Sequence, residues 1–125
     1  MFEIRSEANF SSAHKLIGYD GPCENLHGHN WHVRATVRCT ELNDIGIAID
    51  FKKLKGALRA VCDSLDHLDL NTLFTGPKNN PSSENIARYI HTEIARQIAD
   101  EPNCSMYRVD VFETAGNCAS YFLDA

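Results

Sequence analysis

Apolar and polar residues alternate strictly between Asn30 and Cys39, a pattern typical of a β-strand with one face on a core. The apolar positions are Trp31, Val33, Ala35, Val37 and Cys39, and the polar positions are His32, Arg34, Thr36 and Arg38. Because successive side chains of a strand point to opposite faces, the polar set should face water or a partner. The segment Phe2–Ala13 also has strand-like composition at its start. Two short strands are expected at about Met106–Glu113 and Ala119–Leu123.

Gaps of three and four between apolar residues predict two amphipathic helices. Asp50 can cap the first helix, whose apolar stripe contains Phe51, Leu54, Leu58, Val61 and Leu65. Ser82 or Ser83 can cap the second helix, where Glu84 suits the first turn and the stripe contains Ile86, Ile90, Ile94 and Ile98. A loop rich in Asn, Gly and Pro, from Asn71 to Pro81, separates the two helices.

The predicted order of elements is therefore ββααββ within one domain spanning residues 1–125. Strands that flank a pair of helices favour an α+β fold, in which an antiparallel sheet carries both helices on one face. Four strands leave two sheet edges, which many such domains bury by assembling, so a homo-oligomer is expected.

Composition excludes several classes of function. A net charge of −5 argues against non-specific binding of nucleic acid. No apolar run is long enough to span a bilayer, and the first residues, Met1–Arg5, lack the pattern of a signal peptide. The five cysteines are odd in number and irregularly spaced, which predicts no disulfide framework and a reducing cytoplasm. Cys39 and Cys62 occupy apolar-periodic positions and are expected to be small core residues.

Histidines close to Cys23 predict a metal site. His27 and His29 are two residues apart, so in a strand they project from the same face, and His14 can join them from a neighbouring strand. Three neutral histidines suit zinc with an open fourth position. His32 has the opposite parity and should face away, and His91 lies off the isoleucine stripe of its helix and should be exposed.

The chemistry around this site is open from the residues alone. Cys23 can be a fourth zinc ligand, or an off-metal base or nucleophile. Asp66 next to His67 can hold a protonated imidazole, or simply end a helix. Glu113 can be solvated, or hold a flat heterocycle through two hydrogen bonds. A zinc-dependent lyase, a hydrolase using zinc-bound water and a non-catalytic zinc-stabilised module are all compatible with these residues.

Six segments in order give the chain a resemblance to a known family. They are Ala13–His14, Cys23–His29, Ile49–Phe51, Leu65–His67, Pro81–Asn85 and Glu113–Thr114. Together they resemble the 6-pyruvoyl-tetrahydropterin synthase family, and more narrowly its 6-carboxy-5,6,7,8-tetrahydropterin synthase branch. The short spacing between Cys23 and His27 is similar to that of the carboxy-forming branch, whereas the run Thr114–Cys118 departs from some of its members.

The resemblance implies a tunnel-forming fold, in which subunits assemble into a barrel of two stacked trimers with active sites between subunits. It implies His14, His27 and His29 as zinc ligands and Cys23 as a catalytic thiol off the metal. It further implies Asp66 and His67 as an activating pair. Glu113 would anchor the pterin ring, and Ser82 and Ser83 would line the pterin pocket.

The implied reaction converts 7,8-dihydroneopterin triphosphate to 6-carboxy-5,6,7,8-tetrahydropterin, with release of acetaldehyde and triphosphate, in queuosine and 7-deazapurine biosynthesis. The alternative product within the family is 6-pyruvoyl-tetrahydropterin. A chain with a charge of −5 needs local basic residues to hold a triphosphate, and the candidates are Lys15, Arg34, Lys52, Lys53 and Lys55.

Overall fold

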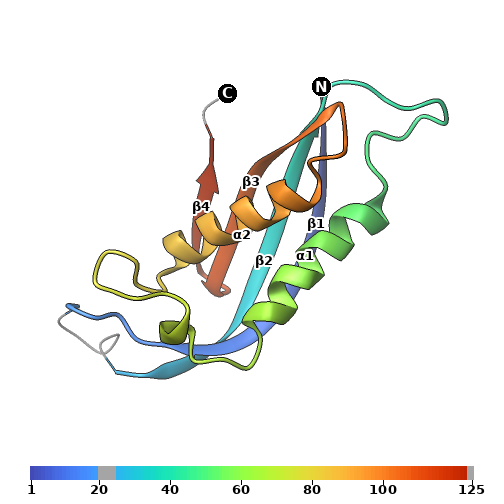
Figure 1. Cartoon of the computed structure of the whole chain (residues 1–125). Helices are drawn as coiled ribbons and strands as arrows, with labels where there is room; N and C mark the ends of the chain where they lie inside the picture. The colour runs from blue at the N-terminus through green and yellow to red at the C-terminus, as the bar shows by residue number, and fades with distance from the viewer. Residues whose placement is uncertain (20–24, 124–125) are drawn as a thin grey trace.

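Four antiparallel strands form one sheet in the order β1-β2-β3-β4, so every strand pairs with its neighbour along the chain (Figure 1). The computed structural model describes residues 1–19 and 25–123. The strands are β1 Phe2–His14, β2 His27–Cys39, β3 Cys104–Thr114 and β4 Asn117–Phe122. Between β2 and β3 the chain forms α1 Phe51–Leu65, the short 3-10 helix η2 Leu70–Thr72, and α2 Ser83–Gln97. The predicted ββααββ order is confirmed.

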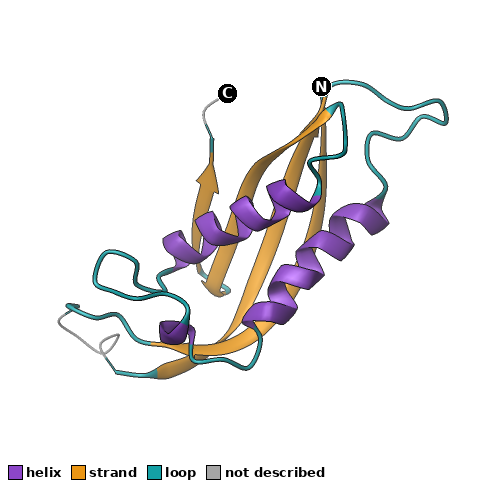
Figure 2. Ribbon diagram, viewed as in Figure 1, coloured by secondary structure: helices purple, strands orange, loops and turns teal. Residues whose placement is uncertain are grey.

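Both long helices cover the same face of the sheet and leave the other face uncovered (Figure 2). Helix α1 packs on β1, while α2 packs on β3 and β4. The predicted α+β architecture is therefore correct. In the described part of the chain, no helix is long and apolar enough to cross a membrane.

The alternation of apolar and polar residues along β2, predicted from the sequence, determines on which face of the sheet the core lies. Its odd-numbered residues from Trp31 to Cys39 are fully buried under the helices. The helical stripes meet them with buried side chains that include Leu54, Leu58, Val61, Leu65, Ile86, Ile90 and Ile94. Asp50 caps α1 by accepting a hydrogen bond from the Lys52 amide at 2.8 Å. Ser82, rather than Ser83, caps α2 by accepting one from the Asn85 amide at 3.2 Å.

Two expectations about the helices are wrong. Phe51 is 68% exposed, because it is the first residue of α1 and precedes the turn in which Leu54 reaches the sheet. His91 is only 4% exposed, because the contact of α2 with β4 buries a wider face than the isoleucine stripe. Its ring meets Tyr121 edge-on at a centroid distance of 5.0 Å, and its Nε2 atom lies 3.2 Å from the Tyr107 carbonyl oxygen.

The cysteines depart from the expectation in one place. Cys39 and Cys104 form a disulfide, because the register of β2 and β3 puts the two residues directly opposite each other. Their sequence separation of 65 gives no sign of this pairing. Cys39 is buried as predicted, but the expectation that no disulfide joins the cysteines is wrong for this pair. Cys62 is a buried thiol as predicted, and burial raises its pKa to about 12.

We expect Leu58→Ala to lower the free energy of unfolding by about 2–5 kcal/mol, because it removes a fully buried side chain and leaves a cavity between α1 and the sheet. Phe51→Ala on the same helix is the matched control, and its effect should stay within roughly 1 kcal/mol because the ring is largely exposed. Urea denaturation followed by circular dichroism measures both. Equal losses in the two variants would contradict the packing described here.

Candidate functional site

Three histidines meet on the helix-covered side of the sheet, near one end of β1 and β2. His14 is the register partner of His27 across the two strands, and His29 follows two residues later on the same face. The ring centroid of His14 lies 4.5 Å from that of His27 and 5.3 Å from that of His29. The ring centroids of His27 and His29 are 4.8 Å apart. The structure thus brings together the three residues that the sequence proposed as metal ligands.

Hydrogen bonds set the tautomer of two of these rings. The Nδ1 atom of His14 lies 2.6 Å from the Pro81 carbonyl oxygen, and that of His27 lies 2.6 Å from the Asn25 carbonyl oxygen. Because a carbonyl oxygen only accepts, both Nδ1 atoms must donate, and in the neutral rings the lone pair is then on Nε2. Backbone carbonyls orient many metal-binding histidines in this way.

The burial of His14 favours the neutral form of histidine that can bind a metal ion. Burial lowers the pKa of His14, with the hydrogen bond to Pro81 opposing this effect in part, so the neutral ring is favoured. The Nε2 atoms of His14 and His29 are buried without a hydrogen-bond partner in the described residues. Orphaned buried nitrogens of this kind fit a site that holds a metal ion, and three imidazoles suit zinc.

Glu113 is the fourth member of the cluster. Its Oε1 atom lies 2.6 Å from His29 Nε2, without the alignment of a hydrogen bond, and 3.6 Å and 4.0 Å from the Nε2 atoms of His14 and His27. Each of the four residues offers one ligand atom, and these atoms all lie within 4.8 Å of one another. Glu113 shares the parity of the buried Val109 and Val111, a signal that sequence analysis could have used to place its carboxylate beside the histidines.

The two serines predicted to line the pocket differ in their contacts. The Ser83 hydroxyl donates to Glu113 Oε2 at 3.4 Å, so Ser83 borders the cluster. The Ser82 hydroxyl is occupied by the cap of α2. The backbone of the same segment also serves the site, since the carbonyl of Pro81 holds His14.

Asp66 and His67 form a rigid pair against β1. The Ser11 amide donates to Asp66 Oδ1 at 2.7 Å, and the His67 amide donates to the Ser11 carbonyl at 2.6 Å. The other Asp66 oxygen accepts from His67 Nδ1 at 2.7 Å. The hydrogen bond from Ser11 is the main cause that lowers the pKa of Asp66, so the carboxylate stays charged well into acid. His67 adopts a positive φ of 56°, a conformation that non-glycine residues seldom adopt.

This pair stands apart from the histidine cluster. The His67 side chain is 82% exposed, and in the described residues its one polar contact is with Asp66, while its backbone amide donates to Ser11. Cys23 lies outside the described residues. Among the proposed triphosphate ligands, Lys53 pairs with Asp100 at 3.0 Å, Lys55 contacts the carbonyl of Glu7, and Arg34 pairs with Asp110 at 3.2 Å.

His32 has the orientation that its parity predicts. Its two ring nitrogens contact Asn9 and Glu7 of β1 on the uncovered face of the sheet, away from the other histidines. The strand β2 therefore carries His29 and His32 on opposite sides.

Several known proteins are similar to this chain in sequence, and others in fold. A 6-carboxy-5,6,7,8-tetrahydropterin synthase from Synechocystis is 34% identical over 127 residues, which cover 98% of this chain and 94% of the relative. A 6-pyruvoyl tetrahydrobiopterin synthase from Drosophila melanogaster is 36% identical over 126 residues, covering 90% of this chain and 74% of the relative. The structure of Caenorhabditis elegans 6-pyruvoyl tetrahydropterin synthase superposes with a TM-score of 0.82 at 26% identity, covering 98% of this chain and 96% of that one.

The family model described as 6-pyruvoyl tetrahydropterin synthase matches residues 3–124, nearly the whole chain. The histidine cluster and the ββααββ order thus occur in a sequence that matches this model from β1 to the end of β4. The chain belongs to the 6-pyruvoyl tetrahydropterin synthase family of enzymes.

Proposed function

We propose that this chain is a zinc-dependent carbon–carbon lyase that converts 7,8-dihydroneopterin triphosphate and one water molecule to 6-carboxy-5,6,7,8-tetrahydropterin, with release of acetaldehyde and triphosphate. The observation that carries the proposal is the group of three histidines beside Glu113 in a member of this family. Relatives named 6-carboxy-5,6,7,8-tetrahydropterin synthase, from Synechocystis and Rickettsia bellii, support the product, and the queuosine pathway follows as a further part of the proposal.

The histidines would hold the zinc ion, with His14 and His27 oriented by their backbone carbonyl partners. Zinc in such a site supplies Lewis-acid chemistry to substrate oxygens. Glu113 would fix the pterin ring through two parallel hydrogen bonds. The Glu113 carboxylate lies against His29 and accepts a hydrogen bond from the Ser83 hydroxyl, so both residues border the proposed ring-binding position.

Two further groups would move protons. The Cys23 thiolate would remove a proton from a side-chain carbon of the substrate. His67, held by the charged Asp66, would exchange a proton at the other side of the substrate. Cleavage of the carbon–carbon bond then follows as a retro-aldol type step.

A second candidate function is 6-pyruvoyl-tetrahydropterin synthesis. The Drosophila relative bears the corresponding name and is 36% identical to this chain. The short spacing between Cys23 and His27 favours the carboxy-forming reaction, and the identity of the product decides between the two.

We expect His29→Ala to reduce bound zinc from about one ion per chain to nearly none, because three histidines are needed to hold the ion. His32→Ala is the matched control, since it lies on the same strand but faces the other side of the sheet. Metal analysis by mass spectrometry after dialysis measures the content. Full zinc occupancy in the His29→Ala protein would contradict the assignment.

Zinc-loaded protein incubated with 7,8-dihydroneopterin triphosphate should release acetaldehyde and form 6-carboxy-5,6,7,8-tetrahydropterin, identified by mass spectrometry. Cys23→Ala should keep its zinc and lower kcat by at least ~10²-fold, because a proton-transfer group is removed. A pyruvoyl product would overturn the carboxy-forming reaction. Loss of zinc from Cys23→Ala would instead identify a fourth metal ligand.

We also propose that the protein assembles into a hexamer of two trimers in the cytoplasm. In this assembly Asp66 and His67 would serve the histidine cluster of a neighbouring subunit. The exposure of His67, and the lack of contact between this pair and its own cluster in the described residues, support this arrangement.

Mixing inactive His29→Ala and His67→Ala chains should therefore restore activity. If a site draws one residue from each of two chains, random mixing in equal amounts leaves about a quarter of the sites intact. Turnover after unfolding and refolding the mixture measures this fraction. A mixture as inactive as either parent would show that each site uses both residues from one chain.

A further inference from the structure

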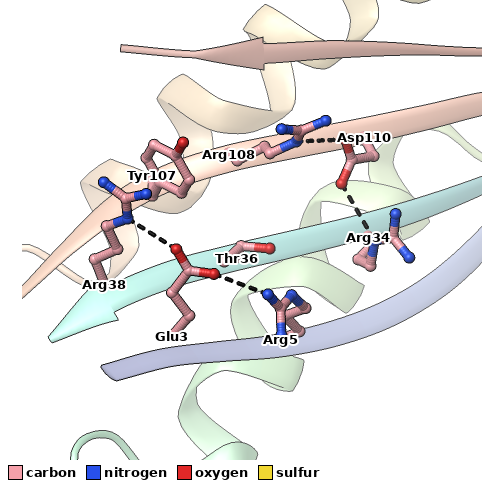
Figure 3. A pocket seen from close by; sticks show the side chains of 8 residues that line it. All are labelled: Glu3, Arg5, Arg34, Thr36, Arg38, Tyr107, Arg108 and Asp110. Carbon is pink, nitrogen blue, oxygen red and sulfur yellow. Dashed lines mark hydrogen bonds and ion pairs between the residues drawn. The ribbon is translucent and has the colours of Figure 1, made fainter. Parts of the chain in front are cut away.

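The uncovered face of the sheet carries a basin of about 500 Å³ that the proposed reaction does not use. Side chains from β1, β2 and β3 line it, and Figure 3 shows how they converge. The charged ones are Glu3, Arg5, Arg34, Arg38, Arg108 and Asp110. Four of these are arginines, in a chain that has only 12 lysines and arginines in total. This face therefore concentrates positive charge on an acidic protein.

Strand register brings these residues together. Arg38 pairs across the strands with Glu3, Arg34 with Asp110, and Thr36 with both Arg5 and Arg108. Arg34, Thr36 and Arg38 are even-numbered residues of β2, and the odd-numbered residues of this strand lie on the side of the core and of His27 and His29. The basin and the histidine cluster consequently lie on opposite sides of the sheet.

Charge in the basin is unbalanced. Asp110 accepts hydrogen bonds from Arg34 Nε at 3.2 Å and Arg108 Nε at 2.8 Å. Glu3 accepts from Arg38 Nε at 2.9 Å and Arg5 Nη2 at 2.8 Å. Each carboxylate thus serves two guanidinium groups, so among the lining residues four positive charges face two negative ones and a surplus of two remains. Glu7, the register partner of Arg34, lies outside this lining and contacts His32.

The arginines are also held in place. Arg38 stacks on the Tyr107 ring, with Cζ 3.4 Å from the ring centroid, and Arg34 lies 5.6 Å from the Phe112 centroid. Asp110 is only 2% exposed. Burial alone would raise the pKa of Asp110, but hydrogen bonds from Ser120, Arg108 and Arg34 outweigh burial and lower it, so the carboxylate stays charged.

Donor groups remain free on these fixed side chains. Arg34 and Arg38 each use only Nε toward their carboxylates, and among the described residues their terminal nitrogens donate no hydrogen bond. The paired N–H groups of a guanidinium match two oxygens of a phosphate group. A multiply charged phosphate would also neutralise the surplus charge. The volume is within the range of small-molecule sites.

We propose that this basin binds a small phosphate-bearing anion, with Arg34 and Arg38 as its principal ligands and with Asp110 and Glu3 positioning them. The site is separate from the histidine cluster, and its existence does not depend on the reaction proposed above.

Inorganic triphosphate is the probe, titrated by isothermal calorimetry into the zinc-loaded protein and into His29→Ala, in which the histidine site is disrupted. We expect saturable binding in both. In the Arg34→Gln/Arg38→Gln double variant we expect binding at the basin to weaken at least ~10-fold, because the principal charge-assisted hydrogen bonds are lost. Arg59→Gln is the matched control, since Arg59 is an exposed arginine on α1, outside the basin, and its loss should leave binding unchanged.

Each other outcome overturns the proposal. Absence of saturable binding to the wild-type protein removes the site. Loss of binding in His29→Ala alone assigns the anion to the histidine cluster, and equal weakening in Arg59→Gln assigns it to general surface charge. If the double variant fails to fold, as judged by circular dichroism, Arg38→Lys decides. It keeps the charge but loses the planar fork, so binding should weaken several-fold, and unchanged affinity would exclude Arg38 as a ligand.

Discussion

The register of β2 between β1 and β3 is the constraint on which the rest of this structure depends. Because side chains alternate along a strand, this register sends Trp31, Val33 and His29 toward the helices and Arg34 and Arg38 toward the uncovered face. A slip of one residue would exchange the two sets, exposing the core and burying guanidinium groups. The hydrophobic pattern that stabilises the sheet therefore also separates the histidine cluster from the basin of arginines.

The histidine cluster is continuous with the hydrophobic core. The Trp31 ring meets His14 and His29 edge-on at centroid distances of 4.9 and 5.4 Å, and its N–H group donates to the Ser12 carbonyl at 3.2 Å. Phe10 stacks on the same tryptophan, with the ring centroids 5.8 Å apart. Side chains locked by packing and by backbone hydrogen bonds hold a site more precisely than side chains on a free loop. The core and the candidate metal centre thus stiffen each other.

Sequence reasoning succeeded where periodicity decides orientation. Strand parity was sufficient to group His27 with His29 and to turn His32 away, and the expectation that His14 joins them from a neighbouring strand is confirmed by the register. It failed where contacts depend on partners distant in the sequence. The burial of His91 depends on β4, and the disulfide of Cys39 depends on the register with Cys104. Phe51 fits the helical stripe but lies at the helix end, where periodicity carries no information about depth. The position of Glu113 among the histidines was accessible from parity, but a residue near a strand end gives a weak signal.

In the proposed reaction, the backbone at His67 places activity and stability in conflict. Its φ of 56° lies in a region where most side chains cost about 1–2 kcal/mol, and where glycine is at ease. Two hydrogen bonds to Ser11 impose this conformation by tying residues 66 and 67 to β1. A glycine would relax the chain here but would remove the imidazole. Selection for a sturdier fold and selection for a proton-carrying ring would therefore favour different residues at position 67.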